Sequence, residues 1–283
     1  MKYHTIEVHE LTPKLGAEVA GANLGQLDVR QIQEIKTALQ DRGVLVFRDQ
    51  TLTQAQHKAF GRLWGDLQTH PAKTHLGVPG DPEIFDISIS GKTKVANGEA
   101  WHTDLSCEPV PPLASALYIT QMPASGGGDT LFASMVEAYR TLSDQMKSLI
   151  IGLRAFHDGR KDLKAYGYEL KPGQTYPSAT HPLVIRHPDS GQPVLFVNEP
   201  FTSHIEGLPP KESDALLDLL YRHTETNTRF HCRVKWQENT VVLWDNRAVQ
   251  HHAVWDYFPE TRRGERVTVR QSSPPQPYEE ALR

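Results

Sequence analysis

The sequence predicts a mainly β protein, a sandwich or barrel with a few helices at its periphery. Many short apolar runs of strand length are separated by turns that draw on 20 prolines and 20 glycines. From Phe230 to Trp236 every second residue is apolar, which is the pattern of a half-buried strand. The sequence shows no internal repeat and no shift in composition that would mark a linker. We therefore expect one domain over residues 1–283.

Four helices are expected. The first covers residues 28–42, with Asp28 as N-cap, Gln31 in a capping box and Gly43 just past the end. Its apolar residues fall at helical spacing: Val29, Ile32, Ile35 and Leu39. The other helices are expected from about Thr53 to Leu63 with Gly65 closing the helix, from near Ser134 with Glu137 completing a capping box, and from about Lys211 to His223.

Strands are expected between and after these helices. The runs that predict them, besides 230–236, are 44–47, 84–89, 116–120, 183–186, 194–197, 240–244 and 267–270. The turn sequence HPDSGQP at 187–193 lies between two such runs and indicates a hairpin loop. Residues 161–179 mix Gly, Pro and Tyr with polar residues, which predicts a long loop and a candidate active-site lid.

The composition favours small-molecule chemistry. A chain of 283 residues buries a substantial core without staples. The two cysteines, Cys107 and Cys232, are too few for a disulfide framework and fit a reducing cytoplasm. A formal net charge of −4 argues against a nucleic-acid partner. No apolar run approaches the roughly 20 residues that a membrane span needs, so no membrane partner is expected.

A candidate metal site begins with WHTD at 101–104. If this segment is extended, His102 and Asp104 project to the same face and are placed to chelate one ion. The pattern is not specific alone, because the chain also contains His187-Pro-Asp189 and His204-Ile-Glu206. A third ligand is sought in His251 or His252, which follow an apolar strand. Two imidazoles and one carboxylate are typical of non-haem iron(II) oxygenases, whereas zinc prefers a fourth ligand, usually water.

A pair of arginines follows this segment. Arg262 and Arg266 are four residues apart, so they share a face if the segment is extended. An arginine-rich run is commonly a solvated edge. A guanidinium is also suited to hold a carboxylate with two hydrogen bonds, as an iron oxygenase that uses a 2-oxo acid requires.

Together these motifs resemble the taurine dioxygenase family of iron(II)- and 2-oxoglutarate-dependent oxygenases. The resemblance rests on WHTD at 101–104, GGGDT at 126–130, WDNRAVQHHA at 244–253 and the Arg262/Arg266 pair, and it extends over nearly the whole chain from LGAEVAG at 15–21. It implies a double-stranded β-helix, or jelly-roll, core.

The resemblance also implies roles for individual residues. His102, Asp104 and His251 would hold Fe(II) and form the catalytic centre, with His252 a neighbour and not a ligand. Thr130 and Arg262 would bind the distal carboxylate of the co-substrate 2-oxoglutarate. Arg266 would contribute to the co-substrate site and would also meet the anionic group of the primary substrate. With O2 as second co-substrate, a C–H bond of the substrate is hydroxylated while succinate and CO2 are released. A hydroxylated carbon that bears a heteroatom can fragment to an aldehyde or ketone, with sulfite leaving from a sulfonate.

The expected substrate pocket partly departs from that of taurine oxidation. His70 and Phe201 match pocket residues of the taurine enzyme, while Lys73 replaces a tyrosine. Gly98, with Asn97 beside it, falls where an asparagine is expected, and Gly159 replaces a second phenylalanine. These changes either enlarge the pocket or, if Lys73 faces solvent and Gly159 only shapes a loop, leave it unchanged. A small anion is expected as substrate: an alkylsulfonate such as taurine, an alkyl sulfate ester or an aryloxyalkanoate.

Two other functional classes fit parts of the pattern. A zinc hydrolase would use the same three ligands with water, but it needs a general base and leaves the Thr130 and Arg262 pair unexplained. A non-catalytic jelly-roll binding module would not need a complete ligand set. The family resemblance further implies a homodimer or homotetramer.

Overall fold

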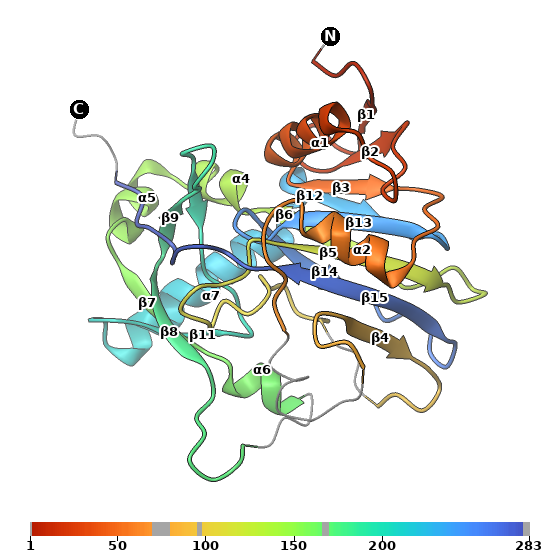
Figure 1. The fold of residues 1–283 in the computed structure, drawn as a ribbon. Helices are drawn as coiled ribbons and strands as arrows, with labels where there is room; N and C mark the ends of the chain where they lie inside the picture. Colours follow the sequence, from red (N-terminus) through yellow and green to blue (C-terminus); the bar gives the residue numbers. More distant parts are fainter. Residues whose placement is uncertain (1, 70–79, 95–97, 166–169, 280–283) are drawn as a thin grey trace.

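The structure is a computed structural model that describes residues 2–69, 80–94, 98–165 and 170–279. Its largest element is a seven-stranded sheet (Figure 1). The strands follow the order β1 (Glu7–Glu10), β2 (Ala17–Ala20), β3 (Val44–Phe47), β13 (Thr240–Asp245), β5 (Ala114–Gln121), β15 (Arg262–Val269) and β4 (Phe85–Ile89). Neighbours are antiparallel, except that β2 and β3 are parallel.

Smaller sheets complete the architecture. One contains β12 (His231–Val234), β6 (Thr130–Ser134) and β14 (Val249–Ala253) in that order. A second contains β11 (Thr202–Ile205), β7 (Arg154–Asp158) and β8 (Ser178–Pro182), and a hairpin pairs β9 (Val184–Arg186) with β10 (Pro193–Leu195). The hairpin confirms the turn predicted at 187–193.

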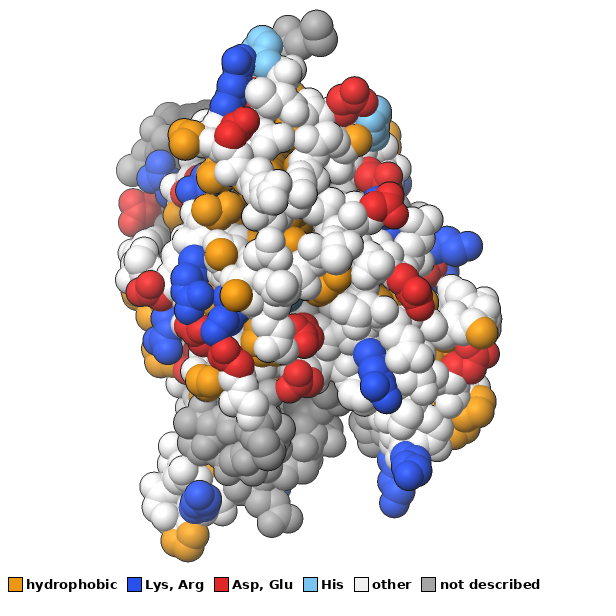
Figure 2. Space-filling model, turned by 45° about the vertical axis from the view of Figure 1, so that its right-hand side comes forward, with side chains coloured by type: hydrophobic (Ala, Val, Ile, Leu, Met, Phe, Trp, Pro, Cys, Tyr) orange, Lys and Arg blue, Asp and Glu red, His pale blue; other side chains and the backbone are white. Residues whose placement is uncertain are grey.

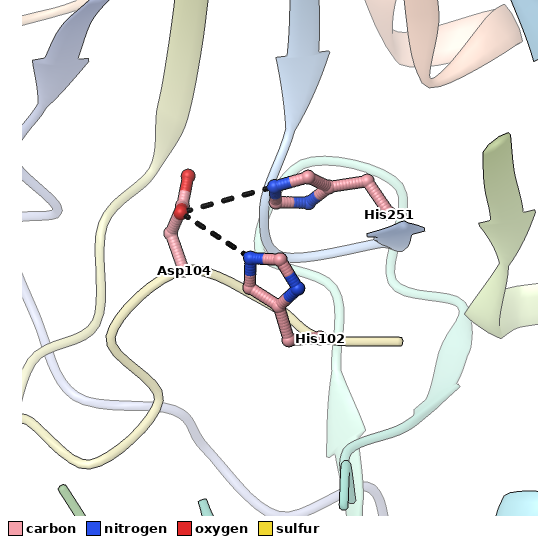
Figure 3. A group of neighbouring side chains, drawn as sticks. All are labelled: His102, Asp104 and His251. Carbon is pink, nitrogen blue, oxygen red and sulfur yellow. Dashed lines mark ion pairs between the residues drawn. The ribbon is translucent and has the colours of Figure 1, made fainter. Parts of the chain in front are cut away.

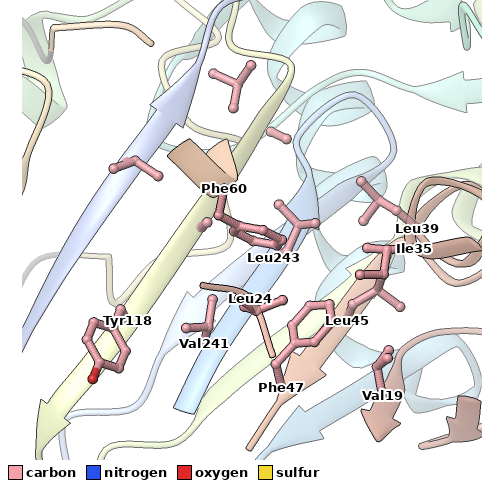
Figure 4. Close-up of a cluster of buried hydrophobic side chains, with 14 of the residues drawn as sticks. Val19, Leu24, Ile35, Leu39, Leu45, Phe47, Phe60, Tyr118, Val241 and Leu243 are labelled. Atoms are coloured by element: carbon pink, nitrogen blue, oxygen red, sulfur yellow. The ribbon is translucent and has the colours of Figure 1, made fainter. Parts of the chain in front are cut away.

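The alternation of strand side chains explains how the sheets pack. In β13, Val242 and Trp244 face the sheet of β12, β6 and β14, where they pack with Phe132 and Val234. Val241 and Leu243, which alternate with them along the strand, face the opposite side of the seven-stranded sheet. This second core consists of Leu45, Phe47, Phe60, Tyr118, Val241 and Leu243 with residues of the helix at 29–42 (Figure 4). The two facing sheets form the predicted jelly-roll core, and helices cover its outside.

The first predicted helix is confirmed as α1 (Val29–Arg42). Asp28 and Gln31 form the capping box, and Gly43 ends the helix at φ +67°. Ile35 and Leu39 are buried as expected, but Val29 at the first position is 85% exposed. The apolar face that packs on the sheet therefore starts one turn later than the sequence predicts.

The remaining helices differ in detail. α2 (Gln54–Gly61) begins after Thr53 as predicted. Its C-cap is Arg62, so the prediction that Gly65 closes it is wrong. α4 (Met135–Arg140) is capped by Ser134, while the Glu137 carboxylate bonds Arg140. α7 covers Pro210–Thr226, three residues longer at its end than predicted.

Other elements were not predicted. They include two short helices, α5 (Asp144–Ile150) and α6 (Arg160–Ala165), the latter inside the expected loop at 161–179. Helices of six or seven residues are too short to show a helical apolar stripe. The end of that expected loop is also wrong, because β8 begins at Ser178.

The surface and the helices agree with a globular protein of mixed charge. Lys and Arg side chains are interspersed with Asp and Glu over the face drawn in Figure 2. None of the helices in the described residues combines the length and the apolar character that crossing a bilayer requires.

Candidate metal centre and co-substrate site

Three side chains of the kind that bind metals, those of His102, Asp104 and His251, converge on the inner face of the jelly roll (Figure 3). His251 lies in β14, and His102 pairs with it across an antiparallel bridge. The two backbone hydrogen bonds of this bridge are 3.0 Å and 2.9 Å long. Asp104 lies two residues further on, so two stretches 147 positions apart in the sequence meet at one point. The bridge thus places all three side chains on one side of the cavity.

The ligand atoms are close enough to share one ion. Oδ1 of Asp104 lies 3.9 Å from Nε2 of His102 and 3.9 Å from Nε2 of His251. One ligand atom of each residue lies within 4.8 Å of the others. All three side chains are buried, and they line a cavity of about 200 Å³. His252, the next residue, packs against Trp101 outside this group.

The imidazoles present the atoms that a metal needs. His102 donates a 2.7 Å hydrogen bond from Nδ1 to the carbonyl of Ala100, which leaves the lone pair of Nε2 facing Asp104. The His251 ring packs on Trp244 and Phe132. Burial, followed by the charge of His102, lowers the pKa of His251, so this imidazole is neutral at pH 7 as a metal ligand must be.

A relay of hydrogen bonds orients the carboxylate. The indole of Trp244 donates to Asn246 Oδ1 at 2.8 Å, Asn246 Nδ2 donates to Ser115 Oγ at 3.0 Å, and Ser115 Oγ donates to Asp104 Oδ2 at 2.8 Å. Arg266 Nη1 donates to the other oxygen at 2.8 Å. Burial opposes ionisation of Asp104, but the charge of Arg266 and, to a smaller extent, the hydrogen bond from Ser115 lower the pKa of the carboxyl.

The cavity extends from the metal ligands to Thr130 and Arg262. Trp236 donates to Thr130 Oγ1 at 3.0 Å, and the Arg262 guanidinium lies 5.2 Å above the same indole ring. Both Thr130 and Arg262 are 6% exposed. Nε of Arg262 is buried and has no hydrogen-bond partner among the described residues. A buried cation with an unused donor is suited to bind an anion.

Glycine at position 128 is required by this wall. Gly128 has φ +89°, and a Cβ there would lie 3.0 Å from Arg262 Cδ and 3.0 Å from Tyr257 Cε1. A side chain would therefore be strained and would push on the guanidinium. This contact gives the GGGDT motif a physical reason.

Comparisons with known proteins show the family to which the chain belongs. The sequence model described as "Taurine catabolism dioxygenase TauD, TfdA family" matches residues 7–269. The chain belongs to this family. It is 32% identical to an alpha-ketoglutarate-dependent sulfonate dioxygenase of Saccharomyces cerevisiae, covering 95% of this chain and 68% of that protein. It is 31% identical to an alpha-ketoglutarate-dependent sulfate ester dioxygenase of Pseudomonas putida, covering 93% and 89%.

A solved structure agrees with the sequence relatives. A putative alpha-ketoglutarate-dependent taurine dioxygenase from Burkholderia xenovorans superposes with a TM-score of 0.82 at 37% identity, covering 95% of this chain and 94% of that one. As a TauD/TfdA protein, the chain is a 2-oxoglutarate (alpha-ketoglutarate) dependent dioxygenase that works with a metal ion.

The substrate side of the cavity in this TauD/TfdA chain is mostly apolar. Its wall includes Phe85, Ile87, Leu105, Leu117, Phe201 and Trp255. Phe201, a predicted substrate-binding residue, is buried and lines the cavity. The other three predicted contacts of this kind, His70, Lys73 and Asn97, lie outside the described residues.

The two glycines singled out in the sequence have different surroundings. Gly98 lines the cavity at φ +85°, and a Cβ there would lie 3.3 Å from Cε1 of His102. A larger residue would crowd this ligand. Gly159 is buried, but its Cβ would meet Cys107 Sγ at 2.9 Å and it is not part of the cavity wall. Of the two interpretations of Gly159, the structure favours the packing role over a larger pocket.

A second group of ligand-type side chains surrounds Arg247. The predicted turn residues His187 and Asp189 lie near Asp245. His187 Nε2 is 3.1 Å from Asp245, which also accepts from Arg247, and Arg247 bonds Asp189 at 2.6 Å. The guanidinium already balances both carboxylates, so this group is an ion-pair network, buried at Asp245 and exposed at Asp189.

Several residues of the site carry no signal in the sequence. Three separate segments supply these residues to the cavity or its ligands. Strand β5 carries Ser115, the segment just after β12 carries Trp236, and the loop before β15 carries Tyr257. Their contacts depend on strand pairing across the whole chain. The sequence contains no spacing that would have brought them together.

Proposed function

We propose that the metal is Fe(II), held by Nε2 of His102, one carboxylate oxygen of Asp104 and Nε2 of His251. The donor set supports this assignment, because two neutral imidazoles and one ionised carboxylate are the ligands of non-haem iron(II) oxygenases. The relay through Ser115 orients the carboxylate, and the bond from His102 to Ala100 orients the imidazole with its Nε2 toward Asp104.

We propose that Thr130 and Arg262 bind the distal carboxylate of 2-oxoglutarate. The unused Nε donor of Arg262, its burial and its contact with Trp236 support the role. When bound, iron and 2-oxoglutarate together with O2 supply the oxidising power that converts a C–H bond to C–OH, with succinate and CO2 as the other products. The protein binds, orients and shields the reactants.

The primary substrate is, in this proposal, a small organic anion with an apolar body. Arg266 lies between the metal ligands and the Phe85 ring, and its buried Nε has no hydrogen-bond partner among the described residues. This donor is available to a sulfonate, sulfate or carboxylate group, while Phe201 and the other apolar side chains contact the carbon skeleton.

The preferred substrate class is an alkylsulfonate, taurine or a larger analogue. Relatives named for sulfonates and sulfate esters support this choice. A hydroxylated sulfonate would release sulfite and leave an aldehyde. An alkyl sulfate ester or an aryloxyalkanoate is the alternative, and the predicted contacts from His70, Lys73 and Asn97 would adjust the choice. Assembly into a homodimer or homotetramer remains part of the proposal.

The observation that carries the proposal is one cavity that holds both the ligand triad and a buried guanidinium, that of Arg262, whose Nε has no hydrogen-bond partner among the described residues. A zinc hydrolase gives no reason for the Thr130 and Arg262 end. A non-catalytic binding module gives no reason for a complete set of three ligand-type side chains facing one cavity.

The test is an assay of purified protein with Fe(II), ascorbate and 2-oxoglutarate under air. We expect O2 consumption and succinate formation that are stimulated by one class in a panel of sulfonates, sulfate esters and aryloxy acids. Hydrolysis supported by zinc alone would favour the hydrolase. Iron binding without succinate across the whole panel would favour the binding module.

A further inference from the structure

A buried polar cluster lies behind the apolar wall of the cavity. Its members are Ser106, His157, Asn198 and Thr202, with exposed fractions of 0%, 0%, 2% and 7%. They come from three segments: the metal loop, defined here as residues 102–108, strand β7, and the wall turn, defined as residues 198–202. The roles proposed for iron, 2-oxoglutarate and substrate use none of these four residues.

Asn198 connects the metal loop to the wall turn. Its Nδ2 donates to Ser106 Oγ at 2.9 Å, and its Oδ1 accepts from the backbone amide of Phe201 at 3.2 Å. The backbone of Asn198 also closes the turn through two bonds with Thr202, each 2.9 Å long. One amide side chain therefore holds both Ser106 and the residue whose ring lines the cavity.

The metal-loop end of this connection lies close to the ligands. Ser106 follows Asp104 by two residues, and between them Leu105 lines the cavity with φ +47°. A non-glycine residue in this conformation is strained and persists only where its surroundings fix it. Ser106 Oγ contacts Asn198 and His157, which are contacts of this fixing kind.

His157 completes the cluster from the side of β7. Its Nδ1 shares a 3.1 Å hydrogen bond with Ser106 Oγ, and burial, followed by the neighbouring His181, lowers the pKa of His157 to about 3. The neutral ring packs between Phe196 and His181. The next residue, Asp158, donates its amide to the carbonyl of Phe201 at 2.8 Å. The backbone of Phe201 is thus held on both its N–H and its C=O.

The pairing of Ser106 with His157 does not form a hydrolytic centre. A serine nucleophile must reach its substrate. Both residues are 0% exposed, and neither belongs to the cavity wall. Their chemistry is limited to holding other groups in place.

We propose that Asn198 is a positioning residue that fixes the substrate wall at Phe201 relative to the metal loop at Asp104. This inference rests on the proposed function, because it takes Phe201 as a contact of the primary substrate. The bracket is defined here as the hydrogen bonds that join the Asn198 side chain to Ser106 and to the Phe201 amide. Loss of the bracket lets the wall turn and the metal loop shift independently. Substrate capture then weakens, and 2-oxoglutarate is converted to succinate and CO2 without hydroxylation of substrate. The ascorbate of the assay supplies the two electrons that, with two protons, reduce the second oxygen atom of O2 to water. Binding of 2-oxoglutarate at Arg262 stays unchanged, because that end of the cavity is built by other strands.

The experiment compares Asn198→Ala and Ser106→Ala with the control Ser213→Ala. Ser213 is also buried and accepts one hydrogen bond, from the Ile205 amide, but it lies in α7 and outside the cavity wall. The first two variants should raise the KM for the primary substrate about tenfold, the effect of losing one buried hydrogen bond. Succinate should exceed hydroxylated product, and the KM for the co-substrate should stay within about twofold. The double variant should cost little more than either single variant, since both break one connection.

Hydrogen exchange supplies a readout that needs no substrate. In Ser106→Ala, backbone amides of both the metal loop and the wall turn should exchange faster than in wild type. In Ser213→Ala, exchange in these two segments should be unchanged. If both bracket variants behaved like Ser213→Ala in kinetics and in exchange, the inference would be wrong. A wild-type enzyme inactive on every anion would contradict the proposed function, and the exchange result alone would then decide for or against the bracket.

Discussion

At one end of the cavity the Asp104 carboxylate accepts hydrogen bonds on both oxygens, whereas at the other end Nε of Arg262 has no partner among the described residues. The metal end is thus fixed by the protein's own side chains. The co-substrate end keeps a buried donor unpaired. The difference teaches that metal ligands must be oriented before an ion binds, while an anion site gains affinity when the ligand supplies the missing acceptor.

The largest expected effect comes from removing a ligand at the metal end. Asp104→Ala should abolish metal binding and lower turnover by about a thousandfold or more, because the remaining imidazoles cannot hold the ion alone. Metal content after dialysis and succinate formation measure this. The control is Asp189→Ala in the ion-pair network around Arg247, which should keep its metal. If the Asp189 variant lost metal and the Asp104 variant did not, the site would be misplaced.

The next effect tests the co-substrate end. Arg262→Ala should raise the KM for the co-substrate, 2-oxoglutarate, about 100-fold, since a charged hydrogen-bonded contact to a carboxylate is lost. Steady-state succinate formation measures this. Affinity for Mn(II) should change little, because the metal ligands do not touch Arg262.

The matched control for this variant is Arg263→Ala. Arg263 is the exposed neighbour in the same strand, and it should behave like wild type. Equal behaviour of the two variants would contradict the assignment of the co-substrate end.

A smaller effect is expected from the relay behind Asp104. Ser115→Ala removes the donor to Oδ2 and should weaken metal affinity by about tenfold to a hundredfold, the usual cost of a lost ligand-orienting bond. Titration with Mn(II) measures this, with Ser213→Ala again as the control. An unchanged affinity would show that the metal end does not depend on prior orientation.

The smallest effect concerns acid stability away from the cavity. Glu34 accepts hydrogen bonds from the amides of His4, Thr5 and Ile6. Burial opposes its ionisation, but these bonds outweigh burial and lower its pKa from 4.5 to about 2. The carboxylate therefore stabilises the fold above pH 4.5, and this contribution is lost as the pH falls toward 2.

Urea unfolding at pH 5 and pH 3 tests whether the ionised Glu34 carboxylate stabilises the fold. Glu34→Gln should show a smaller loss of unfolding free energy between the two pH values than wild type does. The exposed Glu7→Gln should match wild type. A steeper loss in Glu34→Gln would show that the carboxylate is not stabilised in the folded state.

The sequence predicts the parts of the fold that alternate strictly or carry helix caps. The cap at Asp28 and the run 230–236 are such parts. The structure confirms the cap and places a strand, β12, over His231–Val234 of that run, whereas Phe230 ends a short 3-10 helix. The sequence does not predict β14, because the segment VQHHA is mostly polar, although its first three residues are buried. Function overrides strand patterning at this position.

The candidate site likewise contains residues that the sequence predicts and residues that it does not. Local motifs bring forward His102, Asp104, His251, Thr130 and the two arginines, and the structure places all of them around one cavity. The residues that orient them, Ser115 and Asn246 among them, are small polar side chains common in any sequence. Their role follows from the pairing of β5 with β13, which no local pattern encodes.

The most direct test is a crystal structure of the protein with Mn(II) in place of iron and with 2-oxoglutarate. The account predicts one ion bound by His102, Asp104 and His251, and the distal carboxylate of the acid on Arg262 and Thr130. An ion at His187 and Asp245, or 2-oxoglutarate bound away from Arg262, would contradict it.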